Sequence, residues 1–438
     1  MNSPLPPAAL ELNGWSLPHL PFGVPVACSL VAFGVFLAGA PVPSLWIDEG
    51  HSWRYATEPL GTMLSSTLGS SNAVEVGYYL LLHFWTRLMG TSELALRLPS
   101  IIAMSIAVWA TARTAQEALG RHAGLVAGVV LICLPGVTRY AQEARPYAFA
   151  VAAIALSTLM LYRGITRDER RWWAGYGSAL VVVGYAHVLS LLVVAGQLCG
   201  LLLLDRTKWR AYALATGIAM AVVAPLALLG FAQRGQIAWI PPIQFDWLWS
   251  GLSVITGSIA VTALLAVVVL ASSGDRKLVK FSLPIALATP TLLWLIGHLT
   301  PLYLARYLLG ATPGIALVAA ASTSALPRLR LVALAAILVA LTLPQQLALR
   351  GPAAHNQDYR SAAALVATDC AAGIQYDGTS RDAMLYYLAN QPCAPIETHA
   401  GAHLWSVQAS GPLASIPGFR LVRSESFGMA LVGYWART

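Results

Sequence analysis

Long apolar runs separated by short polar stretches dominate the chain from about residue 24 to residue 348. Each run is about as long as a helix that crosses the hydrocarbon core of a bilayer, so the pattern predicts membrane-spanning helices. The weakest boundary is the break at Gly184-Tyr-Ala-His187. We expect about eleven spans, at residues 24–40, 98–113, 123–138, 147–162, 173–187, 188–204, 211–231, 248–271, 281–298, 307–325 and 331–348.

Two regions depart from this pattern. The first loop, residues 41–97, is long and rich in Trp, Tyr, Ser and His, and its segment Val76–Met89 is short and amphipathic, which is typical of a helix lying in the membrane interface. The region 351–438 has strand-like runs at 373–376 and 430–434, and a helical start at Asp358.

The pattern as a whole predicts a polytopic α-helical membrane protein. We expect a transmembrane domain over residues 1–350, with interfacial helices in its first external loop, and a small α/β region over residues 351–438.

Composition agrees with a membrane protein and excludes some other classes. Hydrophobic residues make up 57% of the chain and charged residues 11%, whereas soluble domains carry about 25% charged residues. The net charge of +8 comes from basic residues dispersed among short loops, which argues against nucleic-acid binding.

The positions of the basic residues orient the chain. On this topology, five short loops on one side hold fourteen of the 27 basic residues, the opposite loops hold eight, and the C-terminal region holds five. By the positive-inside rule the first side is cytoplasmic. The N-terminus is then inside, and the first long loop and the C-terminus are extracytoplasmic.

The C-terminal region raises two questions of its own. Cys370 and Cys393 would form a disulfide if the region faces an oxidising compartment, although spacing alone does not establish the geometry. His399 and His403 are four residues apart, but Gly401 between them disfavours a rigid helical metal pair, so we assign no metal ligands there.

The first candidate site is the acidic pair Asp48-Glu49, directly after the first span. Charge beside lipid is costly, so an ionisable pair at such a place is a functional hypothesis by default, with a general base as the first interpretation. The alternative is a helix N-cap, because an Asp before Glu-Gly-His-Ser-Trp-Arg favours the start of a helix.

Three further motifs lie on the same predicted face. The stretch Arg139-Tyr-Ala-Gln-Glu-Ala-Arg-Pro-Tyr147 is either a site or an interfacial belt of tyrosines and snorkelling arginines. Arg306-Tyr307 enters the tenth span, and its guanidinium is either snorkelling or matched to phosphate oxygens. The loop 233–242, with Trp239, is a candidate wall of an apolar groove.

Together these motifs place a carboxylate base and two or three arginines beside lipid. That combination suits a substrate with a phosphate head and a long apolar tail. The base would deprotonate an acceptor hydroxyl, and the arginines would stabilise the departing phosphate. The chain has no Walker A sequence, no GxSxG elbow and no dinucleotide fingerprint, so ATP or NAD chemistry has no support.

Taken in order, the motifs resemble those of the C-type glycosyltransferases over about residues 25–350. The resemblance rests on Asp48-Glu49, Arg54-Tyr55, the stretch from Gly77 to Ser100, Gln142-Glu-Ala-Arg-Pro-Tyr147 and Arg306-Tyr307. It is strongest for the protein O-mannosyltransferases and the lipid A aminoarabinose transferases. One departure is Val76-Gly77, where many relatives have Pro-Pro or His-Pro, and another is the small C-terminal region; both leave the acceptor open.

The resemblance implies inverting transfer of a sugar from a polyprenyl-phosphate donor to an acceptor hydroxyl of a cell-envelope glycan, glycolipid or protein on the extracytoplasmic face. Asp48 looks like the catalytic base. The resemblance assigns catalysis to Asp48, Glu49 and Glu143, and donor phosphate or substrate binding to His51, Arg54, Tyr55, Arg145, Tyr147, Arg306 and Tyr307. No cofactor is required by the sequence, and a divalent metal is left open because related folds differ in metal dependence.

The alanine-rich composition is typical of a high-GC bacterium, which would make the location the bacterial plasma membrane and the sugar a mannose or arabinose. Two other functions stay open. A transporter or flippase of a lipid-linked glycan is one, although such proteins often place charges at the midplane within broken helices. A non-catalytic scaffold of an envelope assembly complex is the other.

Overall fold

The computed structural model describes residues 23–69, 72–272, 274–389, 391, 397 and 401–438 of the 438-residue chain. The chain begins with an apolar helix, α1, and continues into the first loop, which is itself helical. Its elements are α1 (Gly23–Leu37), α2 (Ile47–Thr57), α3 (Leu60–Gly69), the 3-10 helix η1 (Ala73–Glu75) and α4 (Val76–Met89). The helix expected at Val76–Met89 is therefore present with the same bounds.

The remaining helices of the bundle follow without strands. They are α5 (Glu93–Leu119), α6 (Arg121–Cys133), α7 (Pro135–Ala141), α8 (Tyr147–Arg167), α9 (Arg170–Ala186), η2 (Val188–Leu192), α10 (Val193–Asp205), η3 (Arg206–Lys208), α11 (Trp209–Ala232), η4 (Arg234–Ile237), α12 (Trp247–Thr256), α13 (Ile259–Leu270), α14 (Arg276–Gly297), η5 (Ala305–Ala311), α15 (Thr312–Ser322) and α16 (Arg328–Ala348). Every expected span coincides with helical structure, including the break after Ala186.

The expected count of eleven spans is not confirmed. Within the described residues, five helical segments are long and apolar enough to cross a membrane, or up to seven if each of two bent pairs counts as one span. Helices α1 and α15 have 15 and 11 residues, fewer than the roughly 17 to 25 that cross a bilayer. Apolar runs in the sequence therefore overstate the length of the helices that they form.

Two of the runs bend sharply. Helices α6 and α7 meet at 69° and α12 and α13 at 94°. Gly257, between α12 and α13, has a φ of +99°, and a Cβ there would lie 2.4 Å from Cγ of Pro135 at the start of α7. A residue without a side chain is required where these two bends touch.

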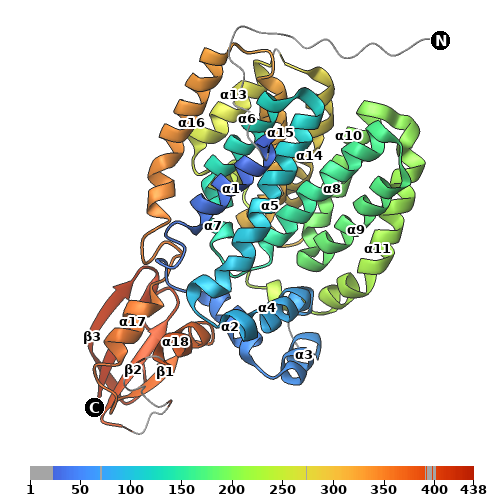
Figure 1. The fold of residues 1–438 in the computed structure, drawn as a ribbon. Coiled ribbons are helices and arrows are strands. Elements are labelled where there is room, and N and C mark those ends of the chain that lie inside the picture. Colours follow the sequence, from blue (N-terminus) through green and yellow to red (C-terminus); the bar gives the residue numbers. More distant parts are fainter. Residues whose placement is uncertain (1–22, 70–71, 273, 390, 392–396, 398–400) are drawn as a thin grey trace, which may run out of the picture.

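The bundle packs around α5 and α14. Helix α5 contacts α1, α6 and α8, and α14 contacts α10 and α15. Figure 1 shows α9, α10 and α11 side by side along one flank of the bundle, with α2, α3 and α4 across one end of it. The first loop is thus a layer of short helices lying over the end of the bundle.

The C-terminal region contains a four-stranded sheet with strand order β1-β2-β4-β3. Strands β1 and β2 are parallel, and β4 is antiparallel to both β2 and β3. The elements are α17 (Tyr359–Val366), β1 (Gly373–Tyr376), α18 (Arg381–Leu388), β2 (His403–Gln408), β3 (Phe419–Phe427) and β4 (Ala430–Arg437). The strand-like runs at 373–376 and 430–434 and the helical start at Asp358 all coincide with these elements.

This region and the first loop share one hydrophobic core. Side chains of α2 and α4, such as Tyr55 and Leu82, pack in the same cluster as Tyr359 of α17, Met384 of α18 and Trp405 of β2. Helix α2 lies so close to α18 that a Cβ on Gly50 would be 2.6 Å from the backbone N of Ala383. The C-terminal region therefore holds the first loop in place, which Figure 1 shows at the lower end of the bundle.

Cys370 takes part in a disulfide. Its expected partner, Cys393, lies outside the described residues, as does His399, so the pairing with Cys393 stays a prediction.

Candidate active site

Helix α2 carries the acidic pair at its start. The helix begins at Ile47, after an extended Trp46, so Asp48 and Glu49 lie in its first turn, where the helix dipole favours negative charge. The N-cap interpretation of Asp48 is wrong, because Trp46 occupies that position and the cap has no side-chain hydrogen bond. The dipole part of that interpretation holds.

Glu49 is completely buried and fully bonded. Its two oxygens accept hydrogen bonds from Arg97 Nε at 2.8 Å and Nη2 at 2.6 Å, and Oε1 also accepts from the backbone N of Ala144 at 2.8 Å. His355 Nδ1 lies 3.4 Å from Oε2. Arg97, itself completely buried, also donates to the backbone oxygens of Ala40, Pro43 and Ser44. Glu49 and Arg97 thus join the end of α1, α2, α5 and the segment after α7.

Glu49 and Arg97 each stabilise the charged form of the other. Burial alone would raise the pKa of Glu49, but the charge and hydrogen bonds of Arg97, with His355, lower it to about 2. Burial lowers the pKa of His355 to about 4. The hydrogen bond to Glu49 acts in the opposite direction, and the positive charge of Arg97 adds to the lowering. At neutral pH the cluster is therefore a carboxylate, a guanidinium and a neutral imidazole.

Asp48 faces the opposite situation. Its side chain is 20% exposed, and its Oδ2 lies 3.9 Å from Arg145 Nε and 3.9 Å from Arg306 Nη1. Among the described residues, Oδ2 has no hydrogen-bond partner. This buried carboxylate oxygen, which two guanidiniums approach without bonding, therefore still has lone pairs that can accept a hydrogen bond.

Arg145 connects Asp48 to a third carboxylate. Its Nη2 donates to Glu75, at the end of η1, and its Nη1 lies 3.4 Å from the hydroxyl of Tyr79 and 3.5 Å from Ser52 Oγ. Tyr79 in turn donates to Glu75. Among the described residues Arg145 Nε has no hydrogen bond, so one donor of this arginine remains available beside Asp48.

The segment that carries Glu75 is held by the loop after α11. Gln236 Oε1 accepts from the backbone N of Asn72 at 2.9 Å, and Gln233 Oε1 accepts from the backbone N of Ala73 at 3.0 Å. Asn72 has a left-handed φ of 64°, which these bonds support at the start of η1. We call Gln233 and Gln236 the glutamine clamp.

Arg306 approaches Asp48 from η5, within a wall of aromatic rings. Its guanidinium lies 6.0 Å from the ring of Trp46, 5.8 Å from Trp239 and 5.8 Å from Tyr307. Its Nε is buried and, within the described part of the chain, has no hydrogen-bond partner. Because burying an unsatisfied guanidinium donor is costly, this arrangement favours an anionic ligand at Arg306.

Tyr147 and Tyr307 extend the aromatic wall. Both rings contact His187, at 5.6 Å and 4.7 Å between centroids, and Arg145 lies 5.9 Å from the ring of Tyr147. The two tyrosines expected beside the donor are thus brought together with Arg145 and Arg306.

Glu143 is completely buried and poorly bonded. Arg139 Nε lies 3.0 Å from its Oε1, but neither oxygen of Glu143 has a hydrogen bond in the described residues. Burial raises the pKa of Glu143 to about 7; Arg139 acts against this, and the charges of Glu49 and Asp48 add to it. Glu143 is therefore a buried carboxyl group close to Asp48 and Glu49, with a pKa near neutral pH.

The structure places His51, Arg54 and Tyr55 at the boundary with the C-terminal region. His51 Nδ1 lies 2.6 Å and Arg54 Nε 3.1 Å from Asp382 Oδ2 in α18. Tyr55 is buried and stacks on Tyr79 at 4.6 Å. These three residues contact the C-terminal region or pack beneath the site, whereas Asp48, Arg145, Tyr147, Arg306 and Tyr307 form one cluster.

Sequence reasoning gave no role to several residues that build the site. Glu75 precedes an interfacial helix as an isolated acidic residue, and that was a usable signal. Arg97 falls inside an apolar helix, where a charge is unusual. His355 and Asp382 gave no signal, and the loop that holds the glutamine clamp was expected only as a groove wall, because the partners of these residues lie 160 to 331 positions away in sequence.

Metal ligation was left open. Across the part of the chain that the structure describes, no three His, Cys, Asp or Glu side chains lie close enough together to hold a metal ion.

Comparison with known proteins gives two findings. Residues 76–232 match the family model of the dolichyl-phosphate-mannose-protein mannosyltransferases. The fold is similar to crystal structures of ArnT from Cupriavidus metallidurans: bound to undecaprenyl phosphate, with 14% identity and a TM-score of 0.63, and in the apo state, with 13% identity and a TM-score of 0.62. Each match covers 93% of this chain and 97% of ArnT. No curated protein matches the chain. The resemblance inferred from the motifs is confirmed at the level of the fold.

Proposed function

We propose, from the likeness of this chain to C-type membrane glycosyltransferases of the mannosyltransferase and ArnT groups, that it transfers a sugar from a polyprenyl-phosphate donor to an acceptor hydroxyl. The observation that carries the proposal is the position of Asp48, whose Oδ2 has no hydrogen bond among the described residues and lies 3.9 Å from both Arg145 and Arg306. A base beside two arginines that can bind phosphate is what this transfer needs.

In the proposed step, Asp48 takes the proton of the acceptor hydroxyl as its oxygen attacks the anomeric carbon. The bond from that carbon to the phosphate oxygen breaks, and the polyprenyl phosphate leaves as an anion. Arg145 and Arg306 stabilise the negative charge on the departing phosphate. Attack from the face opposite to the leaving group inverts the configuration of the sugar.

The other residues have supporting roles in this proposal. Glu49 and Arg97 hold the first turn of α2, Glu75 and Tyr79 orient Arg145, and Tyr147 and Tyr307 line the donor pocket. The prenyl chain would lie in an apolar cavity of about 600 Å³ between α4, α5, α8 and α9. Its lining includes Trp85, Ile102 and Phe149, and ArnT has been crystallised with a prenyl phosphate.

The likeness to ArnT also suggests a bacterial inner membrane, with the site and the C-terminal region outside the cytoplasm. Mannose and arabinose donors are the first to test. A glycan, a glycolipid and a protein are the classes of acceptor to offer.

The first test is Asp48→Asn, which keeps the shape of the side chain and removes the base. We expect transfer by the purified chain to fall about 10²- to 10⁴-fold, with donor binding retained. Asp246→Asn, an exposed change before α12, is the matched control. Undiminished transfer by a correctly folded Asp48→Asn variant would remove Asp48 as the base. Movement of labelled donor across vesicles without sugar transfer would favour a flippase instead.

The second test is Arg306→Ala. Loss of a charge-assisted contact to phosphate should weaken donor binding about ten- to a hundredfold. Arg234→Ala, exposed in the external loop after α11, should leave it unchanged. Donor affinity measured by titration checks both, and an unchanged affinity in Arg306→Ala would contradict the assignment of this residue to the phosphate.

A further inference from the structure

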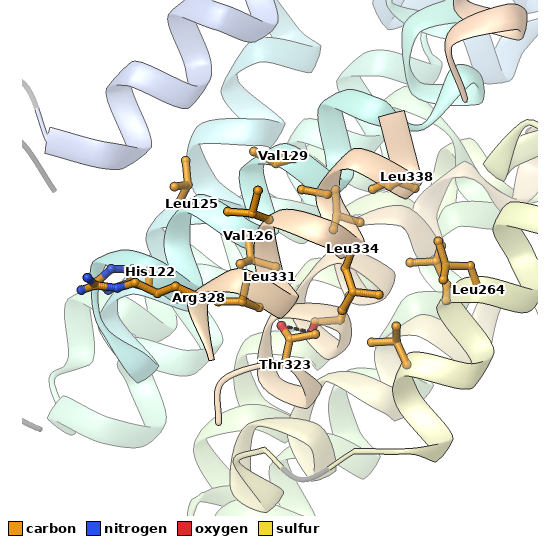
Figure 2. A pocket seen from close by; sticks show the side chains of 16 residues that line it. His122, Leu125, Val126, Val129, Leu264, Thr323, Arg328, Leu331, Leu334 and Leu338 are labelled. Atoms are coloured by element: carbon orange, nitrogen blue, oxygen red, sulfur yellow. Dashed lines mark hydrogen bonds between the residues drawn. The ribbon is translucent and has the colours of Figure 1, made fainter. Parts of the chain in front are cut away.

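A second apolar depression lies at the other end of the bundle from Asp48. It is a groove of about 380 Å³ between α6, α13, α15 and α16. Apart from His122, Thr323 and Arg328, every lining residue is aliphatic, and the hydroxyl of Thr323 donates to Ala319 O within its own helix. Figure 2 shows the aliphatic side chains facing one another across the groove.

The groove exists because α16 packs loosely. Only 11% of the most apolar window of this helix is buried, although the helix is long and apolar enough to span a membrane. Its contacts are with α6, α7 and α13. In a bilayer, an apolar groove beside such a helix is filled by lipid chains and not by water.

The length of the groove matches one leaflet. Along α16 it runs from Arg328 to Leu338, which at 1.5 Å per residue is about 15 Å. That is about half of the hydrocarbon thickness of roughly 30 Å. A phospholipid acyl chain fits this length, whereas a long polyprenyl chain would extend beyond it.

One end of the groove is basic. His122 and Arg328 lie at the starts of α6 and α16, and Figure 2 shows their side chains side by side there. Arg121 directly precedes His122, and Arg330 follows Arg328 by two residues. The other end, at Leu338, is apolar. The groove therefore combines an apolar tail site with a cationic head site at one membrane surface.

We propose that this groove binds an acyl chain of an anionic phospholipid, with Arg328 and His122 holding the lipid phosphate. The site is separate from the donor site, because α6 and α16 both run from the groove toward Glu143 and His355 at the opposite end. The lipid would fill the space between α16 and the bundle.

The experiment measures lipid binding to the purified full chain by native mass spectrometry. Phosphatidylglycerol and phosphatidylcholine of equal chain length are the probes. Wild type should retain phosphatidylglycerol preferentially. Arg328→Gln should lower that affinity about fivefold and leave phosphatidylcholine unchanged.

Two matched substitutions on α16 test the groove itself. Leu334→Trp fills the groove and should abolish binding of both lipids, whereas Ile337→Trp, on the exposed side of the same helix that faces away from the groove, should leave both bound. Equal retention by the two tryptophan variants would overturn the proposal, as would an unchanged lipid preference in Arg328→Gln. Displacement of phosphatidylglycerol by undecaprenyl phosphate, lost in Leu334→Trp, would assign the groove to the prenyl chain instead.

Discussion

Asp48 and Glu49 are adjacent carboxylates on one helix, but their neighbours give them different chemistry. Glu49 meets a buried guanidinium in a two-point contact, and its pKa falls to about 2. Removing one partner of such a pair costs about 3–5 kcal/mol, because the other charge is left buried. Asp48 is only approached by its arginines and keeps a free oxygen among the described residues. The hydrogen bonds that Glu49 makes keep it structural, and the hydrogen bond that Asp48 Oδ2 lacks leaves that oxygen able to accept a proton.

Glu143 supplies a pH test at the same scale. Burial raises its pKa from 4.5 to about 7. Between these two pH values the carboxyl group is protonated in the folded state and ionised in the unfolded state. Stability contributed by this group is present below about pH 4.5 and is lost as pH rises through 7. Glu143→Gln should therefore gain stability relative to wild type as pH rises from 5 to 8, by about 3 kcal/mol at most.

Thermal unfolding in detergent across this range checks the pH dependence. Arg139 keeps its bond to Ala354 O in the variant, so the slope with pH is the quantity to compare, and not the absolute stability. Glu425→Gln, exposed on β3, is the control. A stability difference that stays constant from pH 5 to pH 8 would show that Glu143 does not titrate there.

At the scale of elements, the site is assembled by short segments and not by the long helices. The start of α2, η1, the segment after α7 and η5 each supply one or two side chains. Such segments have little internal stability and depend on contacts from neighbouring elements. The glutamine clamp is one of those contacts, since it ties the loop after α11 to the start of η1.

Removing the glutamine clamp should therefore reduce activity without removing any group that meets the substrate. For Gln233→Ala with Gln236→Ala, loss of two hydrogen bonds of about 1 kcal/mol each should lower kcat/KM roughly tenfold. Gln244→Ala, an exposed glutamine farther along the same loop, should have no effect. Kinetics of sugar transfer measure both variants, and wild-type kcat/KM in the double variant would show that η1 is held by other contacts.

At the scale of the whole molecule, the C-terminal region is part of the support for the site. Its core is continuous with that of the first loop, and α18 lies directly on α2. Asp382, which is 7% exposed, receives both His51 and Arg54. Arg360 and Tyr387 add contacts to Glu93 at the start of α5. The chain from 359 onward therefore braces the helix that carries Asp48.

Asp382→Asn tests this brace. The change weakens the ion pairs to His51 and Arg54, and we expect faster amide hydrogen exchange in α2 and α18, equivalent to about 1–3 kcal/mol of local stability. Arg381→Gln, which breaks an exposed pair with Glu397 beside it, is the matched control and should leave both helices protected. Unchanged exchange in Asp382→Asn would mean that hydrophobic contact alone joins the two parts.

The helices were readable from the sequence because burial in lipid requires long apolar runs, and such runs are local. Val76–Met89 was identified to the residue, and the break after Ala186 was found in a weak signal. The number of crossings was not readable, since bends such as that at Gly257 depend on contact with Pro135, more than a hundred residues away in sequence.

The sequence by itself determined a helical membrane protein with Asp48, Arg145 and Arg306 as candidates, because charge beside lipid is conspicuous in an apolar chain. The tertiary structure decided which of the charged residues pair with one another and which remain available to a substrate. It set Glu49 against Arg97, joined Glu75 to Arg145 and directed His51 and Arg54 to Asp382. These pairings join residues 48 to 331 positions apart, and a single chain carries no local signal of which distant charges its packing will bring together.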